Sequence, residues 1–238
     1  AQVPRGTREE VAEAFRALRT SLYVSNNLAP PASTAIVSAT AKAGKSFTAI
    51  RFAEAVATGF SQQGVVLVDG DCRRPVLHER LHTRRTPGLT DALQGASVAS
   101  VLVDVMSPSG QPYHLMPSGT TVDDPVALLS GPRFARLVAS LGDARAPVII
   151  DTPPVGLFTD PLAIAAMCDA TVLVIDARTS RKRQVVRTVE SLRRSGATLA
   201  GVIVNRTRPD RSSRYYEEGA GTDGKARPRT IRRPADLS

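Results

Sequence analysis

Aromatic residues and cysteines are scarce in this chain, and their scarcity excludes several kinds of protein. The 238 residues include no Trp, and aromatic residues make up 4% of the total. So few rings do not form the base-stacking surface that binds single-stranded nucleic acid. The two cysteines, Cys72 and Cys168, are far apart and have no second thiol at metal-binding spacing. This pattern excludes a disulfide scaffold and suits a reducing cytosol.

Long apolar segments are also missing. No run of apolar residues approaches the roughly 20 that a membrane-spanning helix needs, and no signal peptide is visible. Apolar residues nevertheless make up 42% of the chain, which is enough for a sizeable core. At this length we expect one α/β domain with a short tail rather than two full domains.

Positive charge is in excess. The chain contains 31 Lys and Arg against 22 Asp and Glu, a formal net charge of +9. Many of the cations lie after Asn205, in a segment that is rich in Gly and Pro and poor in apolar residues. Such a segment buries too little apolar surface to fold, so we predict a disordered basic tail at residues 207–238. A basic balance suits nucleic acid, anionic lipid or phosphate ligands, and a solvated tail without a partner is an equally good interpretation.

Strand-like and helix-like segments alternate along most of the chain. Short apolar runs indicate buried strands, and apolar residues at spacings of three and four indicate helices. The alternation predicts an α/β fold with a mostly parallel sheet and helices on both faces, whereas residues 76–111 give a mixed pattern. We expect strands at 35–39, 65–68, 113–116, 148–150, 171–175 and 199–204, and helices at 8–24, 46–60, 125–130, 132–141, from about 160, and at 182–195.

The segment AKAGKS at residues 41–46 follows an expected strand and opens an expected helix. In a P-loop, backbone N–H groups surround the phosphates of a nucleotide, a Lys reaches the β- and γ-phosphates, and a Ser ligates Mg²⁺. Lys45 and Ser46 are the candidates for these two roles. The motif is incomplete, because Ala39 stands where GxxxxGK[ST] has its first Gly, and Lys42 stands where a positive φ would favour Gly.

Two further motifs place carboxylates at the ends of expected strands. Asp69 and Asp71 follow the apolar run VVLV, and Asp151 follows VII. Because functional loops lie at the carboxyl ends of parallel strands, we expect all three motifs to meet there. Asp151 suits Mg²⁺ binding through water. Of the other two, one carboxylate suits the outer shell of the metal and the other suits proton abstraction from a hydroxyl, the alternative being an ordinary Asp-Gly-Asp turn.

The segment HERLH at residues 78–82 fits the H-E-x-x-H pattern of zinc hydrolases. In that interpretation His78 and His82 share a helical face and Glu79 acts as the base. No convincing third ligand lies nearby in the sequence, so a zinc hydrolase is a minor alternative.

The ordered set of motifs resembles the bacterial tyrosine kinases, cytoplasmic P-loop kinases of capsular and exopolysaccharide biosynthesis that partner membrane polysaccharide co-polymerases. VVLVDGDCRRP at 65–75 resembles the second, Asp-rich Walker-type motif of that family. The resemblance continues through GLTDALQG, LMPSGTTVDDPVALLSGPRFARL, DTPPVGLFTDPLAIAAMCDATVLVI and GVIVNR, and so covers nearly the whole chain. The related cell-division and partition ATPases carry a Lys early in the loop, at a place that Lys42 does not occupy.

The resemblance implies a P-loop NTPase-type kinase domain at residues 31–206. An N-terminal helix and linker at 1–30 would precede it, and the basic, Tyr-containing tail at 207–238 would follow. The nucleotide would be ATP, and Asn205 would lie by its adenine. The residues that would contact the nucleotide through the loop are Ala41, Lys42, Ala43, Gly44, Lys45, Ser46 and Phe47.

The resemblance also implies the catalytic roles. Ser46 would bind Mg²⁺ directly, and Asp71 and Asp151 would complete the shell of the metal. Lys45 would position the phosphates. Asp69 would be the base that takes the proton of the tyrosine hydroxyl.

Two more features imply an assembly. Glu13, Arg16 and Arg19 match the E-x-x-R-x-x-R pattern of the family, and this spacing places them on one helical face. That face mediates subunit contacts in a ring in the family, although a solvated helix with ion pairs is a simpler interpretation. Tyr215 and Tyr216 would be the autophosphorylation sites, presented to a neighbouring subunit. The implied location is cytoplasmic, at the inner face of the cell membrane, with a co-polymerase and tyrosine-containing proteins as partners.

Two other functions stay open from the sequence. One is a non-catalytic, nucleotide-binding regulator of a polysaccharide co-polymerase, which the incomplete loop and the sparse tyrosines favour. The other is a partition-type or cell-division-type ATPase that uses its basic tail on DNA, although nucleic acid is not the expected partner.

Overall fold

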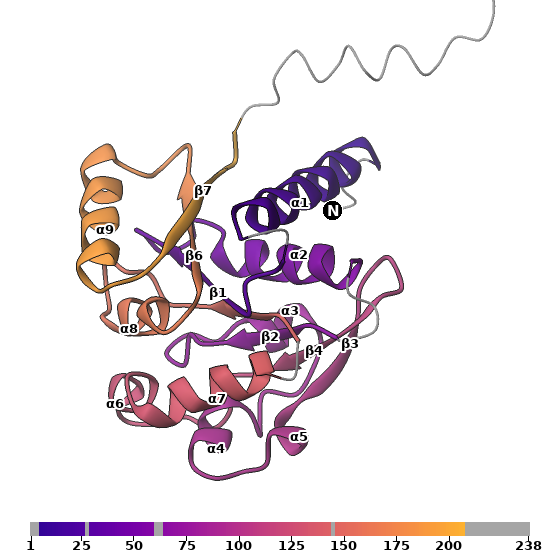
Figure 1. Cartoon of the computed structure of the whole chain (residues 1–238), viewed down its shortest axis with the longest axis vertical. Coiled ribbons are helices and arrows are strands. Elements are labelled where there is room, and N and C mark those ends of the chain that lie inside the picture. Colours follow the sequence, from indigo (N-terminus) through magenta and orange to yellow (C-terminus); the bar gives the residue numbers. More distant parts are fainter. Residues whose placement is uncertain (1–4, 27–28, 60–63, 144–145, 208–238) are drawn as a thin grey trace, which may run out of the picture. The chain divides into compact units, whose positions relative to one another are not determined.

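The computed structural model describes residues 5–26, 29–59, 64–143 and 146–207. Residues 1–206 form one compact unit, which Figure 1 shows as a twisted sheet with helices packed against it. The predicted tail, with Tyr215 and Tyr216, lies outside the described residues. No described helix is both long enough and apolar enough to cross a membrane.

Seven strands form a single sheet. They are β1 (Ser33–Ser38), β2 (Val66–Asp69), β3 (Val103–Met106), β4 (Pro112–Met116), β5 (Val148–Asp151), β6 (Ala170–Asp176) and β7 (Leu199–Asn205). Their order across the sheet is β3-β4-β2-β5-β1-β6-β7. All are parallel except β3, which pairs antiparallel with β4 at one edge. Every residue of β1, β2 and β5 is buried, as expected for strands covered on both faces.

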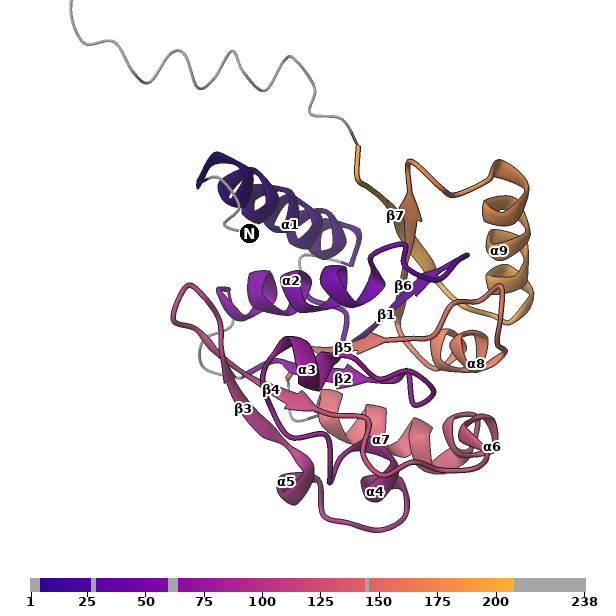
Figure 2. The same ribbon diagram turned by 180° about the vertical axis from the view of Figure 1, so that it is seen from behind.

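Helices cover both faces of this sheet, as Figures 1 and 2 show from opposite sides. The described helices are α1 (Arg5–Ser25), α2 (Lys45–Ala57), α3 (Leu77–Arg80), α4 (Leu89–Leu93), α5 (Val98–Val101), α6 (Pro125–Leu129), α7 (Pro132–Asp143), α8 (Asp160–Ala166) and α9 (Lys182–Arg194). Helices α1 and α2 share one apolar core with the sheet. Helices α4 to α9 contribute to the core on the opposite face.

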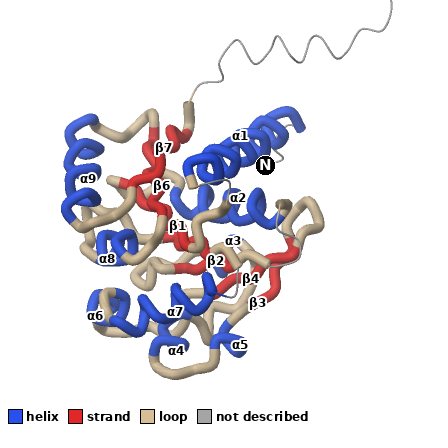
Figure 3. Tube along the Cα trace, in the orientation of Figure 1, coloured by secondary structure: helices blue, strands red, loops and turns tan. Residues whose placement is uncertain are grey.

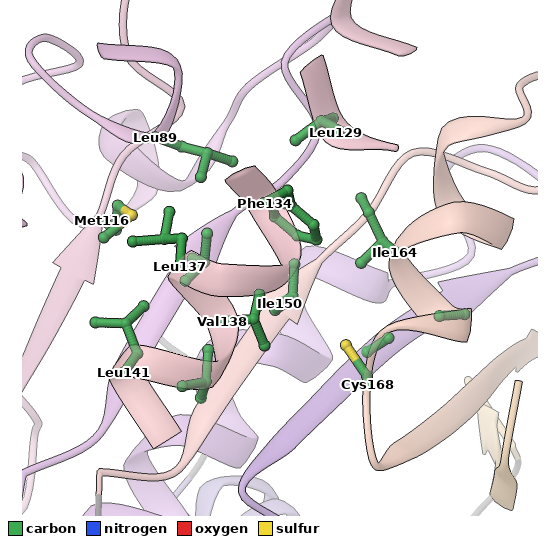
Figure 4. Packing of buried hydrophobic residues seen from close by; sticks show 14 of the residues in the cluster. Leu89, Met116, Leu129, Phe134, Leu137, Val138, Leu141, Ile150, Ile164 and Cys168 are labelled. Carbon is green, nitrogen blue, oxygen red and sulfur yellow. The ribbon is translucent and has the colours of Figure 1, made fainter. Parts of the chain in front are cut away.

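The second core shows why α7 lies where it does. Its apolar residues recur at spacings of three and four, so they form one stripe along the helix. Figure 4 shows Phe134 and Val138 of α7 beside Ile150 of β5, and Leu137 and Leu141 of the same helix on the side of Met116. Phe134 and Ile150 are 0% exposed, and burial of such side chains contributes about 1.5–3 kcal/mol each.

The predicted fold class is confirmed. The strands and helices predicted from the sequence lie within three residues of those in the structure, and Figure 3 displays their alternation along the trace. The mixed segment at residues 76–111 contains α3, α4, α5 and β3. The residue pattern predicted none of these elements, and only α4 falls in a segment, 88–95, whose resemblance to the family implied a loop and a helix. Each of these helices is only four or five residues long, which is too short for apolar residues to recur at helical spacing. Strand β3 is a half-exposed edge strand with an Asp in it, so it lacks the apolar run of a buried strand.

Candidate active site

The three sequence motifs meet at the carboxyl edge of the sheet. Strand β1 leads into the P-loop (residues 39–46), while the neighbouring strands β2 and β5 end opposite each other at Asp69 and Asp151. Beside them lies a cavity of about 610 Å³, a size typical of small-molecule sites. Its lining residues are Lys42, Gly44, Lys45, Ser46, Phe47, Arg80, Asn205 and Arg206.

The P-loop backbone has two residues in the left-handed region. Gly44 has a φ of 106° and Lys42 a φ of 61°. This region is disfavoured for residues with a side chain, so Lys42 occupies a strained position, as the sequence indicated. At Gly44 the chain enters α2, where the Thr48 N–H donates to the Gly44 carbonyl at 2.8 Å. The first N–H groups of a helix have no intrahelical partner, so this end of α2 suits phosphate oxygens.

The end of β7 holds the P-loop from the side. The Asn205 Nδ2 donates to the Ala43 carbonyl at 3.0 Å, and a Cβ on Gly44 would lie 2.1 Å from that nitrogen. The next residue, Arg206, pairs with Asp176 at 2.6 Å. The structure therefore gives Asn205 a contact with the loop, and its contact with adenine stays a prediction.

Lys45 lies inside the site rather than at its surface. The residue is only 7% exposed to solvent. Burial lowers the pKa of its ammonium group, and the nearby Asp151 and Asp71 carboxylates oppose this fall. The Lys45 ammonium group therefore lies near two of the three predicted acids, Asp71 and Asp151.

Asp151 is a buried carboxylate beside a hydroxyl and an ammonium group. It is 1% exposed, and neither of its oxygens is reached by a donor in good hydrogen-bond geometry. Burial raises the pKa of Asp151 to about 6, although the nearby Ser46 hydroxyl and the Lys45 ammonium both act to lower it. A buried, unpaired carboxylate is costly, and a bound cation would remove that cost.

Asp69 is the most enclosed of the three acids. It is 0% exposed, and its Oδ2 accepts a 3.0 Å hydrogen bond from the Leu77 N–H at the start of α3. Its Oδ1 is buried without a partner. Burial and the neighbouring Asp151 charge raise the pKa of Asp69 well above its usual range. A carboxylate in this state is a stronger base than an exposed one.

Asp71 is only half-buried. Burial raises its pKa, and donors from the Arg74 and Arg73 backbone together with Lys45 oppose the rise. The Arg74 N–H donates to the Asp71 Oδ1 at 3.0 Å. Among the three acids, Asp71 is therefore the one most open to solvent.

A clamp that the sequence did not predict fixes the loop after β2. The Arg73 guanidinium pairs with Asp160 at 2.9 Å and lies 4.6 Å from the ring centroid of Phe158. Asp160 is 1% exposed and begins α8. The only signal in the sequence was an Asp-Pro pair at a helix start, which does not identify a partner 87 residues away.

The donors present at this edge fit Mg²⁺. Ser46 offers a hydroxyl, and Asp151 and Asp69 offer buried carboxylate oxygens that lack partners. Within the described residues, no group of three or more His, Cys, Asp or Glu side chains is arranged to hold a metal alone. Mg²⁺ does not need one, because it keeps waters and takes phosphate oxygens of a substrate.

The zinc interpretation of HERLH is not supported. Helix α3 ends at Arg80, and His82 has a φ of 53°. His78 and His82 therefore do not share a helical face. Instead, the segment brings Arg80 to the nucleotide-sized cavity, a role that the sequence did not indicate.

Helix α1 packs beside the site through an aromatic pair. The ring centroids of Phe15 and Phe47 lie 6.2 Å apart in an edge-to-face arrangement, and Phe47 follows Ser46 in the first turn of α2. Of the predicted subunit-contact residues, Glu13 and Arg16 are exposed and pair with each other at 2.6 Å. Arg19 instead donates to the Ala55 carbonyl of α2 at 2.7 Å. The subunit contact itself stays a prediction.

Comparison with known proteins identifies the family. No model of a known protein family matches the chain. The tyrosine-protein kinase CpsD of Streptococcus agalactiae is 32% identical over 197 residues, which cover 82% of each protein. The kinase domain of the Escherichia coli tyrosine kinase ETK is 25% identical, with a TM-score of 0.74 over 84% of this chain and 78% of that one. This chain belongs to the bacterial tyrosine kinases of capsule and exopolysaccharide biosynthesis.

The tyrosine kinase also shares its fold with cell-division ATPases. The septum site-determining protein MinD of Pyrococcus horikoshii, solved with Mg-ADP, is 20% identical with a TM-score of 0.55 over 77% of this chain. At that identity the likeness shows the fold alone. The partition-type alternative is therefore not favoured over the kinase.

Lys42 yields a first prediction. Lys42→Gly relieves the left-handed strain, whereas Lys42→Ala keeps it, so we expect the Gly variant to be more stable than the Ala variant by about 1 kcal/mol. Urea unfolding of the two variants measures this difference. Equal stability of the two would show that Lys42 is not strained in solution.

Asp151 yields a pH prediction. Its pKa of about 6 exceeds the ordinary value of 3.8, so the folded state holds this proton more tightly than the unfolded state does. The free energy of unfolding therefore falls as pH rises from about 3.8 to about 6. Above about pH 6 the protein carries the full destabilisation caused by the buried, ionised carboxylate. Asp151→Asn removes that cost. We expect the ligand-free variant to melt several degrees above the parent near pH 7, with the gap closing near pH 4, and parallel melting curves would contradict this.

Proposed function

We propose that this kinase transfers the γ-phosphoryl group of Mg²⁺-ATP to tyrosine hydroxyls, and that Tyr215 and Tyr216 of a neighbouring copy are its own acceptors. The observation that carries the proposal is the meeting of the P-loop with three carboxylates at one sheet edge. Phosphoryl transfer requires positioning and charge neutralisation more than covalent chemistry. The P-loop and Lys45 can position the phosphates, and the carboxylates can hold the metal ion that neutralises their charge.

The loop and the cavity would hold ATP. Backbone N–H groups at the start of α2 would bind the phosphates, and Lys45 would contact the β- and γ-phosphates. Asn205 and Arg206, at the β7 end of the same cavity, would lie on the side of the nucleoside. Asn205 already fixes the loop, so it would also hold the loop in place around the nucleotide.

Ser46, Asp71 and Asp151 would hold Mg²⁺. When bound, the ion neutralises charge on the β- and γ-phosphate oxygens. The unpaired oxygens of Asp151 support its place in that set. Lys45, which faces the same acids, would balance the remaining charge.

Asp69 would take the proton of the acceptor tyrosine. Its Oδ2 is used by the Leu77 N–H, so we assign the proton to Oδ1, which has no partner. The raised pKa of Asp69 suits this role, because a base works best when its pKa approaches the working pH. The Arg73–Asp160 pair would keep the loop after β2, which carries Asp71, in position.

The assembly proposal rests on the resemblance and on exposure. Glu13 and Arg16 are exposed on α1, so they are available to a second copy. We propose a ring of copies, activated by a membrane co-polymerase at the inner face of the membrane, in which each tail at 207–238 reaches the neighbouring site. The domain limits at 1–30 and 31–206 belong to the same proposal.

The test is a phosphorylation assay with the full chain. The protein is incubated with Mg²⁺-ATP, with and without the cytoplasmic segment of a candidate co-polymerase, and phosphotyrosine is probed beside a Tyr215→Phe/Tyr216→Phe variant. We expect signal in the parent and loss in the variant. Bound ATP without signal under both conditions would indicate a nucleotide-binding regulator instead.

The role of Asp69 gives a sharper prediction. Asp69→Asn keeps an acceptor for the Leu77 N–H but removes the base, so we expect phosphorylation to fall by about 10²–10⁴-fold while ATP affinity changes little. Isothermal titration with Mg²⁺-ATP and a timed phosphotyrosine assay measure the two effects. Unchanged phosphorylation would remove Asp69 from the mechanism.

A further inference from the structure

Before the tail, the net positive charge of the chain is concentrated in α9 and the turn that precedes it. Residues 178–194 contain seven Lys and Arg side chains and one acid, Glu190. All other residues up to 206 contain 16 cations and 16 acids, so as a group they are neutral. A single segment therefore carries the whole net charge of residues 1–206.

These cations are exposed and unpaired with acids. All seven are exposed, and none takes part in an ion pair within the described residues. One of them, Arg194, donates to the neutral Ser191 hydroxyl at 3.3 Å. The seven are Arg178, Arg181, Lys182, Arg183, Arg187, Arg193 and Arg194.

The fold directs part of this charge outward along one helix. Thr188 and Leu192 of α9 are buried against the sheet. Helical periodicity places Arg183 and Arg194 on the opposite side of the helix. Arg187 lies on the flank between the two sides, where it is exposed and also lines a pocket beside the P-loop. Figure 1 shows α9 as the outermost helix at the β7 end of the sheet. The result is a rigid, basic face, which we call the α9 face.

The cations in the first half of α9 do not serve the stability of the helix, whereas Arg194 lies in the last turn, where the helix dipole favours positive charge. Arg181 is the N-cap residue and makes no side-chain capping bond, although Ser, Thr, Asp or Asn would stabilise that position. Lys182 and Arg183 follow in the first turn, where the helix dipole disfavours positive charge. Arg183 and Arg187 are four residues apart, a spacing at which like charges repel. An anionic partner would turn each of these costs into a gain.

We propose that the α9 face binds the anionic surface of a membrane through the phosphodiester groups of its lipids. Apolar side chains lie beside the cations: Val186 of α9 is 45% exposed, and Val202 and Val204 of the adjoining β7 are 48% and 51% exposed. Cations next to exposed apolar groups suit the interface of a bilayer. The segment has no aromatic residue for stacking on bases. This proposal does not depend on the proposed catalytic mechanism.

The attraction has a defined size and salt dependence. Each Lys or Arg near an anionic leaflet strengthens binding by about fivefold. Salt screens this attraction over about 8 Å at physiological ionic strength. Binding through the α9 face should therefore be weak on neutral lipid, strong on anionic lipid, and reduced at high salt.

The test uses vesicle co-sedimentation with the full chain. Vesicles of phosphatidylcholine alone are compared with vesicles that contain phosphatidylglycerol. The variant is Arg183→Glu/Arg187→Glu, and the matched control is Arg133→Glu/Arg136→Glu on α7, which reverses two exposed charges elsewhere. Both variants keep the basic tail, so any difference between them reports on α9.

We expect the parent and the α7 control to bind anionic vesicles within about threefold of each other, and the α9 variant to bind at least tenfold more weakly. The acid introduced at 183 lies in the first turn, where it suits the helix dipole, and the double substitution replaces one like-charge pair at positions 183 and 187 by another. The α9 variant should therefore melt no lower than the parent. Equal binding by the two variants, or equal binding of the parent to both vesicle types, would overturn the proposal. If the protein instead bound duplex DNA through α9 and did not bind anionic vesicles, the proposal would be overturned in favour of a nucleic-acid partner.

Discussion

Three carboxylates and one buried lysine meet where β2 and β5 end, and much of the surrounding structure follows from that meeting. Asp69 and Asp151 stand opposite each other on neighbouring strands, with Asp71 two residues further on. Burial raises the pKa of both Asp69 and Asp151, the Asp151 charge raises that of Asp69 further, and Asp71 adds to the rise at Asp151, so Lys45 alone does not balance the acids. A site with this excess of negative charge is stabilised by a divalent cation and its phosphate ligand. The unliganded enzyme thus gives up stability at the place where it binds substrate.

The neighbouring elements keep these groups close together. A Cβ on Gly70 would lie 2.7 Å from the Asp151 carbonyl, and a Cβ on Gly156 would lie 2.5 Å from the Ala39 carbonyl. Only glycine allows both approaches. Asn205 at the end of β7 then fixes the P-loop, and Asp160 at the start of α8 fixes the loop after β2 through Arg73. The catalytic edge is therefore held by contacts between segments that are distant in sequence.

The sequence predicted what local patterns encode. Continuous apolar runs such as VVLV identify strands buried on both faces, and the rule that parallel strands share a carboxyl edge brought Asp69, Asp71 and Asp151 together. The same patterns do not encode β3, because a half-exposed edge strand has no continuous apolar run. They also do not encode the hydrogen bond from the Leu77 N–H to the Asp69 carboxylate or the ion pair between Arg73 and Asp160, because tertiary packing decides both. Lys42 was predicted in both respects, since the loop motif indicated its positive φ and the family resemblance implied its place at the nucleotide site.

The most direct test of this account is the titration of Asp151. In protein with ¹³C-labelled Asp carboxyl groups, NMR would follow this side chain through pH in the free enzyme and with Mg²⁺-ADP bound, and Asp151→Asn would assign the signal. We expect a pKa of about 6 for Asp151 in the free enzyme and a fall of more than about one unit when the metal and nucleotide bind. A pKa that starts in the ordinary range, or one that does not move on binding, would contradict the claim that this carboxylate cluster is built around a cation.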